Sequence, residues 1–278
     1  MELINCPICD SNNSELYISL KDRFNITNQT FLLVRCECSF IYLNPRPNQN
    51  KIKDFYDSNN YTPHSKASLF YRLAQSISFK WKFKLIKKYI NKNQKILDYG
   101  SGKGEFSNYI EARLAKKLAF SIDNYEPVLN HDNFDCKEDN YQIITLWHSL
   151  EHIHNLNEVI KRIKLSLIDT GYIFIAIPNI NAAEKSFFKD KWVAYDAPRH
   201  LYHFNKITLN NLLNKHGLRI AKSQTIFQDT FYNIYLSIQS NNILIKMLIF
   251  IYISLISIFN ILLNKNKSSS ILYTICKK

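Results

Sequence analysis

The chain has 278 residues, of which 46% are hydrophobic and 21% charged, so a packed core is expected and wholesale disorder is excluded. With only five glycines and six cysteines, collagen-like and disulfide-rich classes are excluded as well. The formal charge of +13 favours an anionic partner, such as nucleic acid, a phosphorylated substrate or an anionic membrane face, although a coding bias towards lysine would give the same excess.

The first 47 residues carry four of the cysteines. Cys6 and Cys9 have the C-x2-C spacing of a zinc knuckle, and Cys36 and Cys38 supply a second pair with a tighter C-x-C spacing. The chain does not begin with a basic segment followed by an apolar one, so we expect a cytoplasmic protein with reduced thiols. We therefore predict a structural zinc in a small zinc-ribbon-like module at 1–47, with free thiols as the alternative.

Residues 48–92 are predicted to form a helical linker or lid. Apolar side chains recur at four-residue spacing from Leu69 to Tyr89, which is typical of an amphipathic helix. Tyr61 and His64 lie where such a lid would close over a ligand.

From Lys95 onwards the pattern alternates between strands and helices. Strands are predicted at 95–99, 118–122, 141–147, 171–177, 218–227 and 271–275, and helices at 105–117, 155–166 and 206–216. This succession indicates βαβ units and therefore an α/β fold with a doubly wound, mostly parallel, Rossmann-like sheet.

A glycine-rich turn follows the first of these strands, in the segment DYGSGKG from Asp98 to Gly104. The third glycine comes one residue too early for a dinucleotide fingerprint, and the segment is not a phosphate-cradling loop either. Asp98 at the strand end would repel a pyrophosphate but attract the ammonium of a methionine moiety. Asp123, expected at the end of the next strand, could accept both hydroxyls of a ribose. The pattern therefore favours S-adenosylmethionine over NAD.

Several segments resemble motifs of the class I S-adenosylmethionine-dependent methyltransferases. Residues 96–104 are similar to their first motif, 141–152 to the fourth-strand segment of their small-molecule branch, and 171–179 to their fifth strand. Residues 196–204 (DAPRHLYHF) resemble a bacterial subgroup that also carries an N-terminal cysteine module and methylates sugars or surface-glycan intermediates.

The resemblance implies a methyltransferase domain at 93–278 whose sheet ends in an antiparallel C-terminal hairpin. It implies methyl transfer from S-adenosylmethionine to a small-molecule or glycan-type acceptor, such as a lipid-linked saccharide. The residues implied to contact the cofactor are Asp98, Gly100, Ser101, Gly102, Asp123, Trp147 and His148. Only 17 residues separate Asp123 from Tyr141, so the helix and third strand of the family are shortened here and no adenine-binding residue is assigned.

Three histidines are candidate catalytic residues: His148, His200 and His203. Each could act as a base or orient the acceptor, because histidine titrates near neutral pH; the alternative is that the loop histidines only bond to the backbone. The segment from His148 to His152 also matches the H-x-x-E-H metal signature. This segment directly follows a buried strand, and no third acidic ligand stands at a suitable spacing, so a metal site is not favoured. We expect Glu151 to act locally instead, near the start of the following helix.

An uncharged apolar run of 17 residues spans 247–263. As a helix it would be about 26 Å long, which is marginal for a hydrocarbon core of about 30 Å. The segment 264–270 reaches at most about 25 Å, so a crossing helix could not return the strand at 271–275 to the sheet. We predict an apolar helical insert at about 232–266 that contacts the inner face of the membrane peripherally. A spanning helix, a homodimer interface and a buried core helix are the alternatives.

Two other function classes stay open. An NAD-dependent oxidoreductase would share the α/β fold. A basic chain with a zinc ribbon could bind nucleic acid. However, the segment Leu146-Trp147-His148 differs from the [DNS]-P-P-[YFW] of enzymes that methylate base amino groups, and no aromatic–basic stripe is present. We therefore expect no nucleic-acid partner.

Overall fold

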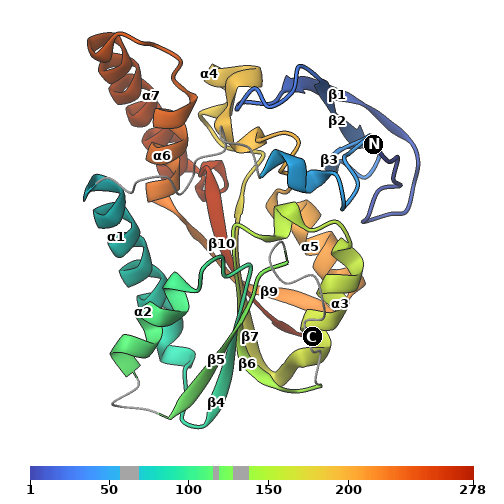
Figure 1. Ribbon diagram of the computed structural model, residues 1–278, viewed down its shortest axis with the longest axis vertical. Helices are drawn as coiled ribbons and strands as arrows, with labels where there is room; N and C mark the ends of the chain where they lie inside the picture. Colours follow the sequence, from blue (N-terminus) through green and yellow to red (C-terminus); the bar gives the residue numbers. More distant parts are fainter. Residues whose placement is uncertain (57–68, 115–118, 128–137) are drawn as a thin grey trace.

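The computed structural model describes residues 1–56, 69–114, 119–127 and 138–278, so the predicted lid residues Tyr61 and His64 lie outside the described residues. Two sheets organise this part of the chain (Figure 1). One has six strands in the order β5-β4-β6-β7-β10-β9, and the other has four strands in the order β1-β2-β3-β8.

The six-stranded sheet is formed by β4 (Gln94–Tyr99), β5 (Phe120–Tyr125), β6 (Tyr141–Trp147), β7 (Leu167–Pro178), β9 (Leu218–Thr225) and β10 (Ser270–Lys277). Strands β4 to β7 pair in parallel, whereas β10 runs antiparallel to both β7 and β9. The mostly parallel sheet with an antiparallel C-terminal pair is therefore confirmed. The described residues between β5 and β6 contain no strand, in keeping with the short connection.

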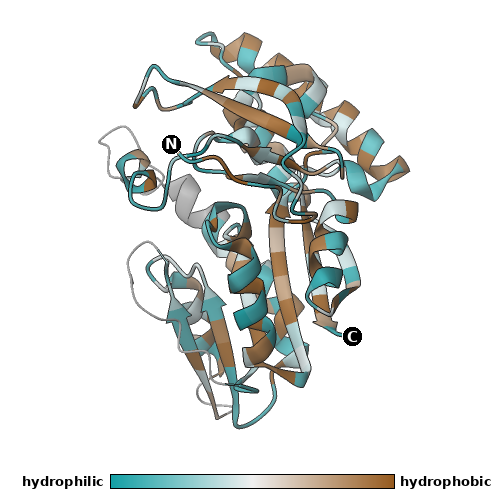
Figure 2. Cartoon of the chain, turned by 90° about the vertical axis from the view of Figure 1, so that its right-hand side faces the viewer, coloured by the Kyte–Doolittle hydropathy of each residue, from teal (hydrophilic) through white to brown (hydrophobic). Residues whose placement is uncertain are grey.

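Helices cover both faces of this sheet: α1 (Leu69–Ile86) and α2 (Glu105–Leu114) lie on one side, and α3 (Leu156–Ser166) and α5 (Lys206–Lys215) on the other (Figure 1). Neighbouring residues on a strand therefore enter different cores; Ile143 packs in the cluster with Phe106 of α2, and Ile144 in the cluster with Ile160 of α3. All seven residues of β6 are buried, as expected for a central parallel strand. Figure 2 shows hydrophobic residues along the central strands and hydrophilic residues mixed into the surrounding helices.

The four-stranded sheet combines N-terminal strands with one strand from much later in the sequence. Strands β1 (Ser14–Lys21), β2 (Thr30–Cys36) and β3 (Ile41–Leu43) come from the cysteine-bearing segment, and the edge strand β8 (Tyr202–His203) pairs with β3. The N-terminal strands are thus packed against the segment that precedes α5. The division into domains at 1–47, 48–92 and 93–278 stays a prediction.

Two helices are inserted between β9 and β10: α6 (Phe227–Ser237) and α7 (Ile243–Leu263). Only 17% of the most apolar window of α7 is buried, and by length and composition it is the one helix among the described residues that could cross a membrane. Short helices complete the structure: η1 (Ile52–Phe55), η2 (Lys87–Tyr89), η3 (Leu150–His152), α4 (Lys185–Phe188), η4 (Lys189–Lys191), η5 (Val193–Tyr195) and η6 (Lys265–Lys267).

Candidate functional site

The glycine turn after β4 packs directly against the turn after β6. Gly100, Gly102 and Gly104 all have positive φ angles, at +77°, +56° and +73°. A Cβ atom added to Gly100 would lie only 2.6 Å from the Cβ of Ser149 and closer still to its hydroxyl. Glycine at position 100 therefore allows the two turns to meet at the carboxyl edge of the sheet, where ligands bind in open α/β folds.

Asp98 lies at this edge and is only 3% exposed. The hydroxyl of Thr145 donates a hydrogen bond of 2.6 Å to its carboxylate. Burial raises the pKa of Asp98, while the hydrogen bond from Thr145 and the charge of Lys82 oppose that shift. The carboxylate is thus held in place at the base of the glycine turn.

A cation already lies beside Asp98. The ammonium of Lys82, from α1, is 4.7 Å from the ring centroid of Trp147 and 5.5 Å from that of Phe106. Burial lowers the pKa of Lys82, and the negative charges of Asp98 and Asp229 act against that shift. Carboxylates and aromatic faces both attract cations, and in this structure the ammonium of Lys82 takes that place.

The prediction that Asp123 ends its strand is wrong, because β5 continues to Tyr125 and Asp123 lies opposite Leu97 inside the sheet. Its exposed carboxylate accepts a hydrogen bond of 2.7 Å from the Tyr141 hydroxyl. Glu126 follows the strand instead and accepts a hydrogen bond of 2.9 Å from the N–H of Gly102. The acid at the glycine turn is therefore Glu126, which sequence analysis missed because the strand is two residues longer than its pattern suggested.

His148 is held by two acidic side chains. Its Nε2 is 3.0 Å from Asp229 of α6, and its Nδ1 is 3.5 Å from Glu151. Burial alone would lower the pKa of His148, but the charge and hydrogen bond of Asp229, with a contribution from Glu151, raise it to about 10. A protonated imidazole has no lone pair to accept a proton, so His148 is not poised as a base.

His200 is brought close to Glu151 and His152. One ligand atom from each of these residues lies within 4.8 Å of the others, and the rings of His152 and His200 are 4.7 Å apart. Glu151 is completely buried, whereas the two histidines are partly exposed. The H-x-x-E-H motif contains Glu151 and His152, for which we expected no metal site, and His200, 48 positions further along, lies outside it.

His203 differs from its prediction. It was expected in a loop over the site, but it belongs to β8, is 4% exposed and faces the ring of Tyr195. Burial lowers the pKa of His203 to about 3, helped by repulsion from His200, so the ring stays neutral. The two histidines therefore differ in exposure, since His203 is buried and His200 is partly exposed.

A buried ion pair network fixes the segment that carries His200. The guanidinium of Arg199 is fully buried and lies 2.7 Å from Asp22 and 2.8 Å from Asp196. Burial would raise the pKa of Asp196, but Arg199 and Arg23 hold it well below its usual range. Because Asp22 follows β1 and Arg199 precedes β8, this network ties the segment that carries His200 to the N-terminal part of the chain.

The four cysteines converge as predicted from their spacing. All four Sγ atoms lie within 4.8 Å of one another, with Cys6 3.5 Å from Cys38 and Cys9 3.4 Å from Cys36. A tetrahedral zinc with Zn–S bonds of about 2.3 Å requires sulfurs about 3.8 Å apart, so the thiols fit a four-thiolate zinc site.

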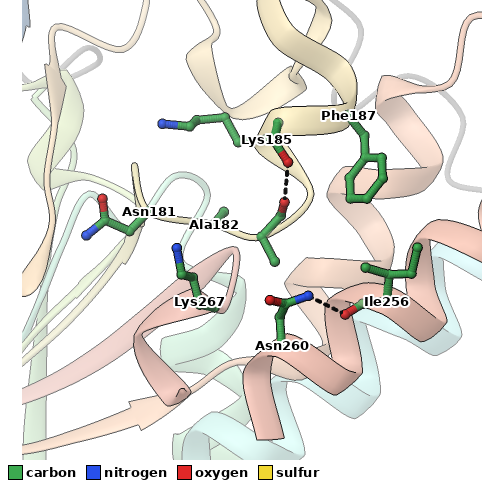
Figure 3. Close-up of a pocket in the computed structure, with 9 residues that line it drawn as sticks. Asn181, Ala182, Lys185, Phe187, Ile256, Asn260 and Lys267 are labelled. Atoms are coloured by element: carbon green, nitrogen blue, oxygen red, sulfur yellow. Dashed lines mark hydrogen bonds between the residues drawn. The ribbon is translucent and has the colours of Figure 1, made fainter. Parts of the chain in front are cut away.

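A polar pocket of about 330 Å³ lies between the segment after β7 and α7 (Figure 3). Its walls include Asn181, Lys185, Asn260 and Lys267, with Phe187 and Ile256 on the apolar side. The ammonium of Lys185 also donates a hydrogen bond of 2.8 Å to the Tyr17 hydroxyl. Two lysines and two amides make this pocket suited to an anionic or hydroxylated ligand.

Comparison with known proteins gives one family match. A family model described as a methyltransferase domain matches residues 67–223, which is more than half of the chain. No curated protein matches. Similar solved structures include a phosphoethanolamine N-methyltransferase 2 from Haemonchus contortus, in complex with phosphomonomethylethanolamine and S-adenosylhomocysteine. It is 13% identical, the match covers 96% of this chain and 68% of that chain, and the TM-score is 0.49. Another is a SAM-dependent methyltransferase from Archaeoglobus fulgidus, with 17% identity, 76% of this chain and 100% of that chain covered, and a TM-score of 0.46.

Proposed function

The chain belongs to the methyltransferase-domain family and is an S-adenosylmethionine-dependent methyltransferase, and on that premise we propose that it methylates a small-molecule or glycan-type acceptor such as a lipid-linked saccharide. Membership of this family sets aside an NAD-dependent oxidoreductase and a purely nucleic-acid-binding protein. The observation that carries the proposal is the buried carboxylate of Asp98 beside the glycine turn.

When bound, S-adenosylmethionine supplies an electrophilic methyl group. The chain's part is to hold the methionine end with the carboxylate of Asp98, with the glycine turn beside it and Trp147 forming the aromatic wall. The N–H groups of the turn stabilise the turn itself, because those of Gly100 and Ser101 donate to the Tyr125 carbonyl and that of Gly102 donates to Glu126. Glu126 accepts the ribose hydroxyls in place of Asp123, because its carboxylate is the one that reaches the turn. His148 positions the turn after β6 through its ion pair with Asp229.

Calorimetric titration with S-adenosylhomocysteine tests this assignment. Asp98→Asn keeps the shape and the hydrogen bond from Thr145 but loses the charge that pairs with the ligand ammonium. A hydrogen bond to a charged group contributes about 1.5–3 kcal/mol, so we expect the affinity to fall about 10- to 150-fold. Glu126→Gln should also weaken binding, whereas Asp123→Asn should leave it within about twofold. Equal effects of Asp98→Asn and Asp123→Asn would contradict the assignment.

His200 faces the acceptor in this proposal. It is partly exposed, next to the buried Glu151, in a segment that Arg199 anchors to the N-terminal sheet. His203 lies in β8 with its ring against Tyr195, and we assign the contact with the acceptor to His200 alone.

We also propose that α7 rests on the cytoplasmic face of a membrane. Its outward side carries large apolar residues that are more than half exposed, including Leu248 (68%), Leu255 (63%) and Phe259 (63%). Soluble monomers rarely expose continuous apolar patches of this kind. Since α7 leads within a few residues into β10 of the sheet, a peripheral contact is compatible with the fold. The pocket that Lys185 and Lys267 help to line could take the phosphate of a lipid-linked acceptor.

Sedimentation with phosphatidylglycerol vesicles tests the membrane contact. Each exposed leucine that enters an apolar phase contributes about 1.5–3 kcal/mol, so replacing Leu248, Leu255 and Phe259 together by serine should reduce vesicle binding at least tenfold. The matched control is Leu16→Ser, which alters an equally exposed leucine of β1 and should have no effect. If the triple variant binds vesicles as well as the parent, or if α7 instead pairs two copies in solution, the proposal is wrong.

The zinc ribbon remains part of the proposal. Four thiols that converge within 4.8 Å support a zinc site. Because four thiolates would leave no ligand position open for chemistry, the zinc would be structural.

A further inference from the structure

Glu151, His152 and His200 form a cluster that lies beside the cofactor residues and has no part in holding the cofactor. We propose that this cluster binds a divalent transition-metal ion, and, resting on the proposed function, that the ion holds the hydroxyl group of the acceptor. One ligand atom from each residue already lies within 4.8 Å of the other two. The N–H of Leu201 donates to the carbonyl of Glu151 at 2.8 Å, which locks the two contributing segments together.

Each of the two histidines has its Nδ1 atom against a backbone carbonyl. The Nδ1 of His152 is 2.9 Å from the carbonyl oxygen of Arg199, and the Nδ1 of His200 is 2.8 Å from that of Ala194. A carbonyl oxygen can only accept, so in each neutral ring Nδ1 carries the hydrogen and Nε2 keeps the lone pair. Histidines bound to metals typically donate their second nitrogen to a carbonyl or carboxylate in this way.

The carboxylate of Glu151 lacks partners that its burial would demand. Its side chain is 1% exposed, and neither oxygen has a hydrogen-bond partner among the described residues. The nearest cation is His148, 3.5 Å away, and His148 makes a shorter contact of 3.0 Å with Asp229. One positive charge is thus shared between two carboxylates. A second cation next to Glu151 would neutralise a buried charge that otherwise destabilises the fold.

The ligand set indicates the kind of ion. Two imidazoles and one carboxylate suit zinc, iron, cobalt, nickel or manganese, whereas magnesium and calcium prefer oxygen ligands alone. Three protein ligands also leave positions open, which separates this site from the four-thiolate site of the cysteines. His152 and His200 are partly exposed, so a ligand can reach those positions.

The open position explains what the site would do in methyl transfer. An acceptor hydroxyl bound to the ion becomes more acidic and releases its proton to a water molecule. Its oxygen then forms a bond to the methyl carbon while the bond from that carbon to sulfur breaks. The electron pair of the broken bond stays on sulfur, so the positively charged sulfonium becomes a neutral thioether.

Cobalt binding tests the site independently of activity. The full chain, with zinc at its cysteines, is titrated with cobalt chloride, and sulfur-to-cobalt charge-transfer absorption reports any cobalt at the thiols. We expect one further equivalent of cobalt without that absorption. Glu151→Gln and His200→Gln should each weaken its binding at least tenfold, while Glu158→Gln, on the exposed side of α3, should leave it unchanged.

Titration with S-adenosylhomocysteine on the same samples separates the possible failures. A protein that binds this ligand but no extra cobalt overturns the metal site and leaves the proposed function standing. A protein that binds cobalt at these residues but not S-adenosylhomocysteine supports the metal site and overturns the proposed function. Because His200 is partly exposed, His200→Gln is expected to keep its melting transition even if Glu151→Gln does not fold, and unchanged cobalt affinity in it would refute the proposal.

Discussion

The contact between the two turns of the site gives a quantitative prediction about Gly100. Substitution by alanine at a positive φ costs about 1–2 kcal/mol, because the Cβ crowds the following carbonyl. At Gly100 the new Cβ would also lie 2.6 Å from the Cβ of Ser149, and overpacking of this kind costs about 1–3 kcal/mol more. At Gly102 the φ angle is positive too, but no atom lies within 4 Å of the added Cβ.

We therefore expect Gly100→Ala to reduce the free energy of unfolding by about 2–5 kcal/mol and Gly102→Ala by only about 1–2 kcal/mol. Urea unfolding of both variants measures the difference. Ser149→Gly removes both atoms that the new methyl group meets and leaves only Ser149 Cα, at an ordinary 3.8 Å. In the Ser149→Gly background, Gly100→Ala should destabilise the protein no more than Gly102→Ala does. The coupling energy between positions 100 and 149 is then about 1–3 kcal/mol.

The reasoning fails if Gly100→Ala and Gly102→Ala destabilise the protein equally, or if Ser149→Gly gives no relief. Titration with S-adenosylhomocysteine adds a functional readout, because the turn is proposed to lie against the cofactor. Gly100→Ala should weaken binding, and the double variant should restore most of it.

Two further predictions concern the metal-ligating thiols and a buried acid. Cys9→Ser should weaken zinc binding at the cysteines by more than about tenfold, since loss of even a hydrogen-bond partner of a metal ligand lowers metal affinity about 10- to 100-fold. Metal analysis that finds no zinc in freshly purified protein would rule out the ribbon. Glu184 is fully buried, and burial raises its pKa, against hydrogen bonds from Ser269 and Trp192. The carboxyl of Glu184 therefore loses its proton near pH 4.3 in the unfolded chain but keeps it to a higher pH in the folded protein. As the pH rises from there towards the pKa of Glu184 in the folded protein, the unmodified protein loses up to about 1.4 kcal/mol of stability per pH unit. Glu184→Gln lacks this loss, and its advantage in thermal or urea unfolding should grow with pH over that interval; a constant difference would contradict the argument.

Much of the fold could be predicted from short-range patterns. The run of buried residues in β6 and the alternation of strands and helices indicated a parallel sheet, because strands covered by helices on both faces must be apolar throughout. Asp98 and the glycine turn were recognised for a similar reason, since the turn conformation depends on residues next to one another in sequence.

Predictions that depended on element ends or on distant contacts were less successful. Asp123 was placed at a strand end that in fact lies at Tyr125, because the pairing of β5 with β4, rather than its own sequence, determines where the strand stops. His203 was expected in a loop, but hydrogen bonds to β3 turn its segment into a strand. No local pattern contains that partner, which is 162 positions away in Ile41.

The sequence by itself determined the α/β architecture, the glycine turn with its acid and the two cysteine pairs, all of which follow from neighbouring residues. Only the tertiary structure decided that Glu126 reaches the turn, that Asp229 pairs with His148 and that His200 lies beside Glu151 and His152. The physical reason is that hydrogen bonds, ion pairs and metal ligation act over a few ångströms, and only the packing of the two sheets and the inserted helices brings such distant segments within that range.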